Sequence, residues 1–155
     1  MWEVELVSEG DAEKIAKLYK SVWKGYEVKL PEPLLKDRTP EKEQISEWMK
    51  SKTYFVVRSG DIIIGVVRCS IVHGTCLLDR MAVDGEYRRQ GMGTALAQKV
   101  IDYAKENRAI KVWLDSSPRL KAAISLYKKM GFRECGHFQK HYWGEDIKFF
   151  ELLLK

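Results

Sequence analysis

Two arginines and two glycines lie close together near the middle of the sequence, in the stretch Arg88-Arg89-Gln90-Gly91-Met92-Gly93-Thr94. The stretch lies between an apolar strand-like segment and residues with helical spacing, so its glycines lie where a helix should begin. A helix N-terminus carries unpaired backbone N–H groups and partial positive charge, and glycine lets a phosphate oxygen approach that backbone closely. Arginine adds a charge that does not titrate near neutral pH. These features predict a site for a pyrophosphate group.

Two well-known phosphate-binding loops fit this stretch poorly. A Rossmann turn reads G-x-G-x-x-G directly after its strand, whereas Leu96 stands at the third glycine position and Gly91 lies eight residues beyond Val83. A Walker loop ends in Gly-Lys-Ser or Gly-Lys-Thr, whereas Gly93 is followed by Thr94-Ala95. A helix N-terminus that simply tolerates glycine stays open as the plain structural alternative.

The composition is typical of a soluble globular protein. With 155 residues, of which 45% are hydrophobic and 32% charged, the chain is long enough for one domain over residues 1–155. No stretch approaches the roughly 20 apolar residues of a membrane span, and the first residues lack the order of a signal peptide. We therefore expect a cytoplasmic protein with no membrane partner.

The charge and the cysteines exclude further classes of protein. The net charge of +5 is spread along the chain without a long basic run, so nucleic acid is not an expected partner. The three cysteines, Cys69, Cys76 and Cys135, lack a second ligand pair at zinc spacing, so no metal site is expected. An odd number of cysteines in a chain of this size favours a reducing compartment and packing roles.

The apolar periodicity predicts a mixed α/β sheet with helices on its faces. Helices are expected from about residue 11, from residue 40, after Gly91, and over 119–130. Residues 24–40 hold three of the four prolines and are expected to form a loop or a broken helix. Strands are expected at 4–7, 54–57, 62–72, 77–83, 110–114, 133–142 and 147–153.

Residues 77–132 resemble the GCN5-related N-acetyltransferase (GNAT) superfamily, nearest to the branch that acetylates protein N-termini such as the alanine of ribosomal proteins. The superfamily's signature is Gln or Arg, two residues, Gly, one residue, then Gly or Ala, and residues 88–93 match it. Residues 81–84 resemble the end of its fourth strand. Leu126-Tyr127, ahead of Gly131-Phe132, resembles its second signature.

This resemblance implies a mostly antiparallel sheet of about seven strands, flanked by about four helices and splayed between its fourth and fifth strands. It also implies that acetyl-CoA binds, with pantetheine in the cleft and pyrophosphate on the glycine turn. Carried onto this sequence, the cofactor-binding positions are Met81, Ala82, Val83, Arg88, Arg89, Gln90, Gly91, Met92, Gly93 and Thr94.

The chemistry of acetyl transfer assigns roles to three side chains. The amine must lose a proton and the departing thiolate must gain one. Tyr127 holds the family's general-acid position, and a tyrosine has a pKa close to that of a thiol. Asp115 matches the acid that ends the fifth strand in the N-terminal branch. Asp79 is a second candidate base, because it shares the strand parity of Leu77, where the histone-acetylating branch has glutamate.

Each of these residues also has a purely structural interpretation. Tyr127 could pack in a core, and the two acids could cap a turn or pair with lysine. Leu120 departs from the branch, which often has asparagine there. Residues 141–146 resemble the strand-turn in which that branch places a tyrosine of the peptide site, although an aromatic hairpin would look similar.

The expected function is transfer of an acetyl group from acetyl-CoA to a primary amine, on a protein N-terminus or a lysine, by direct attack without a metal. Two alternatives stay open. One is the same reaction on a polyamine or an aminoglycoside-like amine, and the other is an acyl-CoA sensor without turnover. The acceptor loop at 24–40 mixes acidic and basic residues and does not identify the acceptor. We also keep a homodimer open as the assembly.

Overall fold

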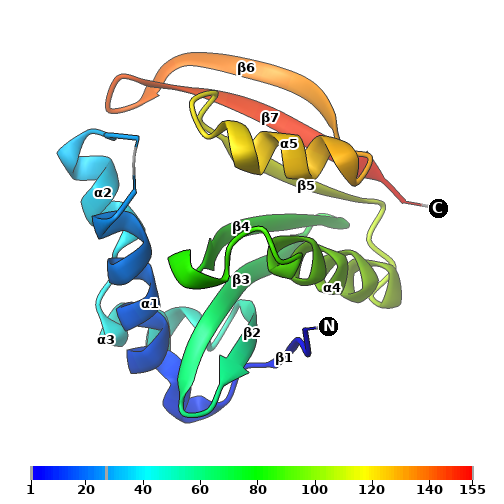
Figure 1. Cartoon of the computed structure of the whole chain (residues 1–155). Helices are drawn as coiled ribbons and strands as arrows, with labels where there is room; N and C mark the ends of the chain where they lie inside the picture. The colour runs from blue at the N-terminus through cyan, green and yellow to red at the C-terminus, as the bar shows by residue number, and fades with distance from the viewer. Residues whose placement is uncertain (1, 27, 155) are drawn as a thin grey trace.

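The computed structural model describes residues 2–26 and 28–154. In these residues one seven-stranded sheet, ordered β1-β2-β3-β4-β5-β7-β6, is flanked by five α-helices (Figure 1). The strands are β1 Glu5–Leu6, β2 Thr53–Ser59, β3 Ile62–Val72, β4 Thr75–Val83, β5 Lys111–Ser116, β6 Arg133–Tyr142 and β7 Glu145–Leu153. The helices are α1 Ala12–Lys24, α2 Glu32–Arg38, α3 Lys42–Trp48, α4 Met92–Glu106 and α5 Lys121–Lys129, with 3₁₀ turns η1 Glu9–Asp11 and η2 Gly85–Tyr87.

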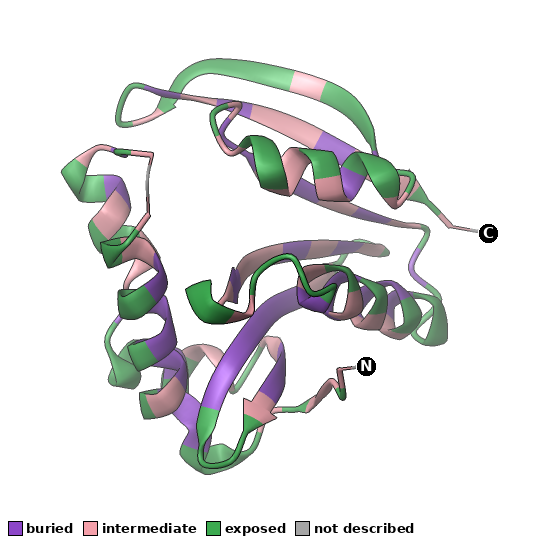
Figure 2. Ribbon diagram, viewed as in Figure 1, coloured by how far each residue is buried: buried purple, intermediate pink, exposed green. Residues whose placement is uncertain are grey.

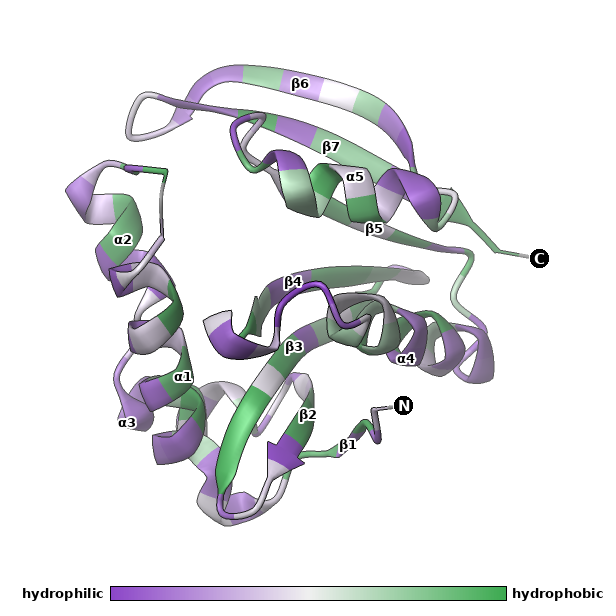
Figure 3. Cartoon of the chain, viewed as in Figure 1, coloured by the Kyte–Doolittle hydropathy of each residue, from purple (hydrophilic) through white to green (hydrophobic). Residues whose placement is uncertain are grey.

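The helices cover the sheet from both faces. On one face α4 and α5 pack on the strands through Leu96, Val100 and Tyr127. On the other face the first three helices approach the sheet, and α1 buries Ile15 and Tyr19 there. The middle of β3 is buried, as Figure 2 shows, and most of it is apolar in Figure 3, with Arg68 as the buried charged residue. The predicted α/β class is confirmed.

The sheet opens between β4 and β5. All neighbouring strands pair antiparallel except these two, which pair in parallel through three residue pairs, Thr75↔Lys111, Cys76↔Val112 and Leu77↔Trp113. Beyond these pairs residues 78–83 and 114–116 diverge, and we call this divergence the split (Figure 1). The predicted splay between the fourth and fifth strands is therefore present.

A β-bulge lies on the β4 side of the split. Val66 pairs with Ala82 but Arg68 pairs with Asp79, so β4 carries one extra residue opposite β3. Arg80 is at the bulge, and its φ is +50°. A bulge breaks the alternation of side chains along a strand. As a result Asp79 and Arg80 both face the side of α1–α3, while Met81 packs on the side of α4 and α5.

Helix α2 was not separately predicted. It lies inside the segment expected to be a loop or broken helix, and it begins directly after Pro31 with Pro33 in its first turn, where proline is tolerated. Only Leu34 of α2 is buried, so its seven residues carry no apolar periodicity. The expected bounds of α5 also shift, because Leu120 has a non-helical ψ of +67° and the helix begins at Lys121.

Candidate active site

The glycine loop forms the start of α4. Gly91 caps the helix with φ of +83°, a left-handed conformation that suits glycine, and the Ala95 N–H donates to its carbonyl. A Cβ added to Gly91 would find no atom within 4 Å. Arg88 and Arg89 lie exposed just before it. Open space beside free helix N–H groups and two arginines suits a phosphate-sized anion.

Aromatic side chains from distant parts of the chain hold this loop. The Trp2 Nε1–H donates to the Gln90 carbonyl at 2.7 Å, and the Trp2 ring meets Tyr87 edge-on at 5.9 Å. The Arg88 guanidinium lies 5.2 Å from the centre of the Tyr26 ring. Sequence reasoning missed Trp2, because a partner 88 residues away leaves no local signal.

Tyr127 points from α5 toward the β4 side of the split. Its hydroxyl lies 3.8 Å from the Met81 sulfur, its ring packs edge-on against Phe132, and only 6% of the residue is exposed. Burial raises the pKa of Tyr127, and the charge of Asp79 raises it further. The hydroxyl therefore keeps its proton at neutral pH and can donate it. The loop is adjacent, because a Cβ on Gly93 would lie 3.8 Å from the same sulfur.

The two candidate acids have different surroundings. Both oxygens of Asp79 accept hydrogen bonds from Arg68, at 2.9 and 2.6 Å, and this pair is largely buried. Asp115 has no ion-pair partner within 4.0 Å among the described residues. Its carboxylate is the one left available to take up a proton.

Burial raises the pKa of Asp115. The charges of Arg38 and His141 and a hydrogen bond with Tyr142 lower this pKa, whereas the charge of Asp79 raises it. Asp79 thus acts electrostatically on both Tyr127 and Asp115.

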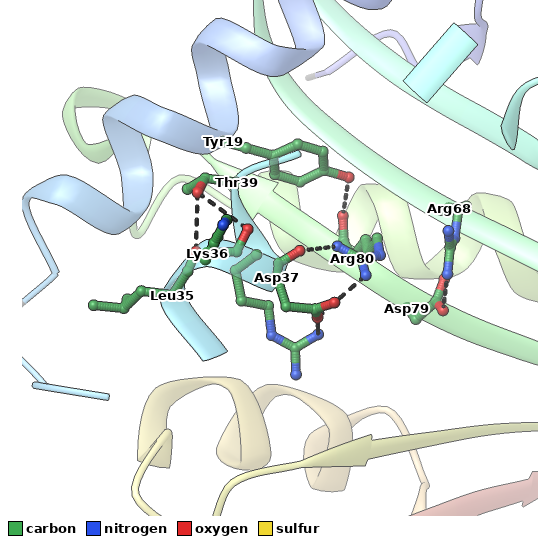
Figure 4. Close-up of polar contacts among 9 residues, drawn as sticks. Tyr19, Leu35, Lys36, Asp37, Thr39, Arg68, Asp79 and Arg80 are labelled. Carbon is green, nitrogen blue, oxygen red and sulfur yellow. Dashed lines mark hydrogen bonds and ion pairs between the residues drawn. The ribbon is translucent and has the colours of Figure 1, made fainter. Parts of the chain in front are cut away.

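Helix α2 is tied to the bulge, as Figure 4 shows. The Tyr19 hydroxyl donates to the Arg80 carbonyl at 2.7 Å. The Arg80 guanidinium donates to the Asp37 carbonyl at 2.7 Å and to its carboxylate at 3.3 Å. The guanidinium groups of Arg80 and Arg68 both lie over the Trp48 ring. The position of α2 is therefore set by the strand that borders the split.

A second tie links α5 to the segment before α2. Arg119 donates to the carboxylate of Glu145, which is only 8% exposed, and also to the Lys29 carbonyl at 2.8 Å. These residues come from the segment just before α5, the start of β7 and the segment before α2. Arg119 therefore joins the three segments around the split.

Two of the predicted cofactor-binding residues have buried side chains. Ala82 and Met92 are buried in the two cores, so only their backbones can face a ligand.

Cys69 and Cys76 are buried free thiols, and Cys135 is exposed. Within residues 2–26 and 28–154 no three His, Cys, Asp or Glu side chains gather as they would around a metal ion. None of the helices in these residues has the length and apolarity of a membrane span.

A sequence model described as the acetyltransferase (GNAT) family matches residues 15–132. The chain belongs to this family. N-acetyltransferase 8B of Mus musculus is 29% identical over 143 residues, which is 87% of this chain and 60% of the mouse protein. The [ribosomal protein bS18]-alanine N-acetyltransferase of Escherichia coli (strain K12) is 35% identical over 72 residues, 46% of this chain and 49% of that protein. The chain spans about half the length of the curated relatives it matches.

Solved structures of family members share the fold. The ribosomal-protein-S18-alanine N-acetyltransferase from Escherichia coli superposes with a TM-score of 0.81 at 20% identity, over 100% of this chain and 95% of that one. PaiA N-acetyltransferase from Thermoplasma acidophilum, solved in complex with coenzyme A, gives a TM-score of 0.80 at 17% identity over 96% and 98% of the two chains. The resemblance to the GNAT superfamily is confirmed.

Proposed function

We propose that this chain transfers an acetyl group from acetyl-CoA to a primary amine. The observation that carries this proposal is the split, with the Tyr127 hydroxyl beside β4 and an open glycine loop next to it. The names of the mouse and Escherichia coli relatives support N-acetyl transfer, and the structure with coenzyme A supports the cofactor.

The residues present fit this cofactor. The open space at Gly91 would accept its pyrophosphate, bound by the first N–H groups of α4 and by Arg88 and Arg89. The backbone of residues 81–83, which has no partner on β5, would hold the pantetheine arm. Acetyl-CoA supplies the activated acyl thioester.

The proton transfers are proposed for three side chains. Tyr127 donates a proton to the departing thiolate. The raised pKa of Tyr127 keeps its hydroxyl protonated until that step. Asp115 accepts the proton of the amine, directly or through a water molecule. Asp79 is the weaker candidate for this second role, because its two oxygens already accept from Arg68. With these roles the amine attacks the thioester directly, and the reaction needs no covalent enzyme intermediate.

For the acceptor we propose an amine on a protein N-terminus or a lysine, by analogy with the ribosomal-protein relative. We propose the cytoplasm as the place of the reaction. A polyamine or aminoglycoside-like amine is the second class. A sensor without turnover is less well supported, because such a domain has no need for a buried tyrosine hydroxyl beside β4. The test is incubation of the full chain with acetyl-CoA and a panel of peptides, ribosomal proteins and polyamines, with mass spectrometry of the acceptors.

Gly91→Val should abolish the rise in melting temperature that acetyl-CoA causes in the wild-type protein, because its side chain would occupy the space left for phosphate. The substitution also strains the backbone, since φ is +83°. Gly60→Val is the matched control, because Gly60 has φ of +60° and open space but lies in the β2–β3 turn. A shift lost in both variants, or kept in both, would remove Gly91 from the site.

Trp2→Phe should weaken binding of acetyl-CoA about two- to tenfold, because the variant loses the hydrogen bond to the Gln90 carbonyl. S-acetylpantetheine has no pyrophosphate, so its affinity should stay unchanged. Isothermal titration calorimetry with both ligands measures the difference. An equal loss for the two ligands would mean that Trp2 supports the fold in general and not the loop.

A further inference from the structure

Charged side chains gather where α2, the bulge and the β6–β7 hairpin approach the split. Most of them form close pairs that neutralise each other. The three close pairs are Arg68–Asp79, Arg80–Asp37 and Arg119–Glu145. Among the partly buried charges that the structure describes there, one arginine and one acid remain without such a pair, and these are Arg38 and Asp115.

Arg38 is an unusually isolated cation. Its side chain is only 24% exposed, yet the nearest carboxylate oxygen of the described residues, on Asp37, is 4.0 Å away. The same oxygen already accepts from Arg80 at 3.3 Å. A largely buried guanidinium usually has a carboxylate or phosphate in direct contact, because desolvation of its charge is costly. The position of Arg38 is therefore suited to an anion that residues 2–26 and 28–154 do not provide.

Arg38 is also held in place. It is the last residue of α2, and the preceding residue, Asp37, is bound through both its carbonyl and its carboxylate by Arg80 on the bulge. The charge of Arg38 acts on Asp115 of β5 and on Tyr142 of β6. The cation and the free acid thus lie in the same region without forming an ion pair with each other.

A free cation and a free anion kept near each other match a ligand that carries both charges. A polyamine would gain from Asp115 but would be repelled by Arg38. An amine with a carboxylate close to it would satisfy both side chains. A guanidinium binds a carboxylate through two parallel N–H···O bonds, which adds geometric selectivity to the charge attraction.

We propose that Arg38 binds a carboxylate carried by the acceptor, next to the amine that faces Asp115. This inference rests on the proposed transferase function and narrows its acceptor class. The carboxylate has two sources with the same chemistry. It can be the α-carboxylate of an amino-acid-like acceptor, or an acidic side chain that follows the N-terminal residue of a peptide.

The test measures binding, so that it does not depend on turnover. The full chain is saturated with coenzyme A, which carries no acetyl group, and acceptors are titrated by calorimetry. One pair of probes is phenylalanine and phenylalanine amide, and the other is alanyl-aspartate α-amide, which keeps its side-chain carboxylate, and alanyl-asparagine amide. The proteins are wild type, Arg38→Gln, Arg38→Lys, and Lys36→Gln, which removes an exposed charge from the same helix.

The wild-type protein should bind the carboxylate member of at least one pair, and Arg38→Gln should weaken that binding about ten- to hundredfold. Binding of the neutral member should change less than about twofold, with Arg38→Lys intermediate and Lys36→Gln unchanged. The same two probes are compared in each protein, so the difference in their amine basicity cancels. The pair that shows the effect identifies the source of the carboxylate.

Equal binding of both members by the wild-type protein, no binding of any probe, or an equal loss for both members in Arg38→Gln would each overturn the proposal. Acetylation of amines is followed in parallel with acetyl-CoA. If amines are acetylated without preference for a carboxylate, the inference about Arg38 fails and the proposed function stands. If selective binding occurs without acetyl transfer to any acceptor, the proposed function fails and the carboxylate site stands.

Discussion

Replacement of Tyr127 by phenylalanine should lower kcat for acetyl transfer by roughly 10²–10⁴-fold, the usual contribution of a general acid. The ring would keep its edge-on contact with Phe132. Among the described residues the deleted hydroxyl has one hydrogen-bond partner, the Met81 sulfur at 3.8 Å, so the folded protein loses little. Affinity for acetyl-CoA should change less than about twofold, because the loss concerns the transition state only.

Tyr103→Phe is the control for this loss of a hydroxyl group. Tyr103 lies on α4, and its hydroxyl shares a 3.2 Å hydrogen bond with Thr53, away from the split. This variant should keep the wild-type kcat with the same acceptor. Steady-state kinetics and calorimetry with acetyl-CoA give the two quantities. Full activity of Tyr127→Phe on a confirmed acceptor would reject the general-acid role.

Asp115→Asn should lower kcat/KM by roughly 10²-fold on the acidic side of the pH profile. The base works in its ionised form, so the rate of the wild-type protein rises as pH passes the pKa of Asp115, which burial raises. In the variant the rise should move to higher pH, where the amine itself loses its proton. The two profiles should approach each other at high pH. Identical profiles would exclude Asp115 as the base.

The same variant should be more stable than the wild type at neutral pH. A carboxyl whose pKa is raised in the folded state binds its proton more tightly there than in the unfolded chain, so ionisation costs stability. The gain in melting temperature from Asp115→Asn should therefore shrink as pH falls through the raised pKa. The charge of Arg38 and the hydrogen bond with Tyr142 reduce the size of the gain, because both favour the ionised form.

Asp79→Asn is the comparison that separates the two acids. It leaves Arg68 buried without its carboxylate, a loss that typically costs about 3–5 kcal/mol. Its melting temperature should fall where that of Asp115→Asn rises. If Asp79 is the base, the rise in rate should move to higher pH in this variant and not in Asp115→Asn.

Those parts of the fold that depend on local pattern could be predicted from the sequence. The run of apolar residues in β3 and the stripe that includes Leu96 and Val100 on α4 identify a buried strand and an amphipathic helix. The glycine turn was predictable for a similar reason, because Gly91 occupies the left-handed position that starts α4. Element order and the place of the loop follow from such local signals.

The acceptor side could not be predicted in the same way. Helix α2 has one buried residue and two prolines at its start, so its sequence resembles a loop. The bulge at Arg80 depends on its pairing with β3 and on the Tyr19 hydroxyl from α1. The isolation of Arg38 can be recognised only once the ion pairs Arg68–Asp79 and Arg80–Asp37 are known. Such features arise from contacts between distant segments, for which the sequence carries no periodic signal.

The three residue pairs between β4 and β5 have a consequence for how this chain can diverge. Strands β5, β7 and β6 come from one continuous stretch and pair among themselves, whereas the glycine loop follows β4 on the other side of the junction. Exchange of residues 111–154 between relatives would transfer Asp115 and Tyr127 as a cassette, while Arg38 and the glycine loop would stay with the host. The cassette would have to fit the core that it shares with Leu96 and Val100. The bond from Arg119 to the Lys29 carbonyl marks where such a cassette must match its new host.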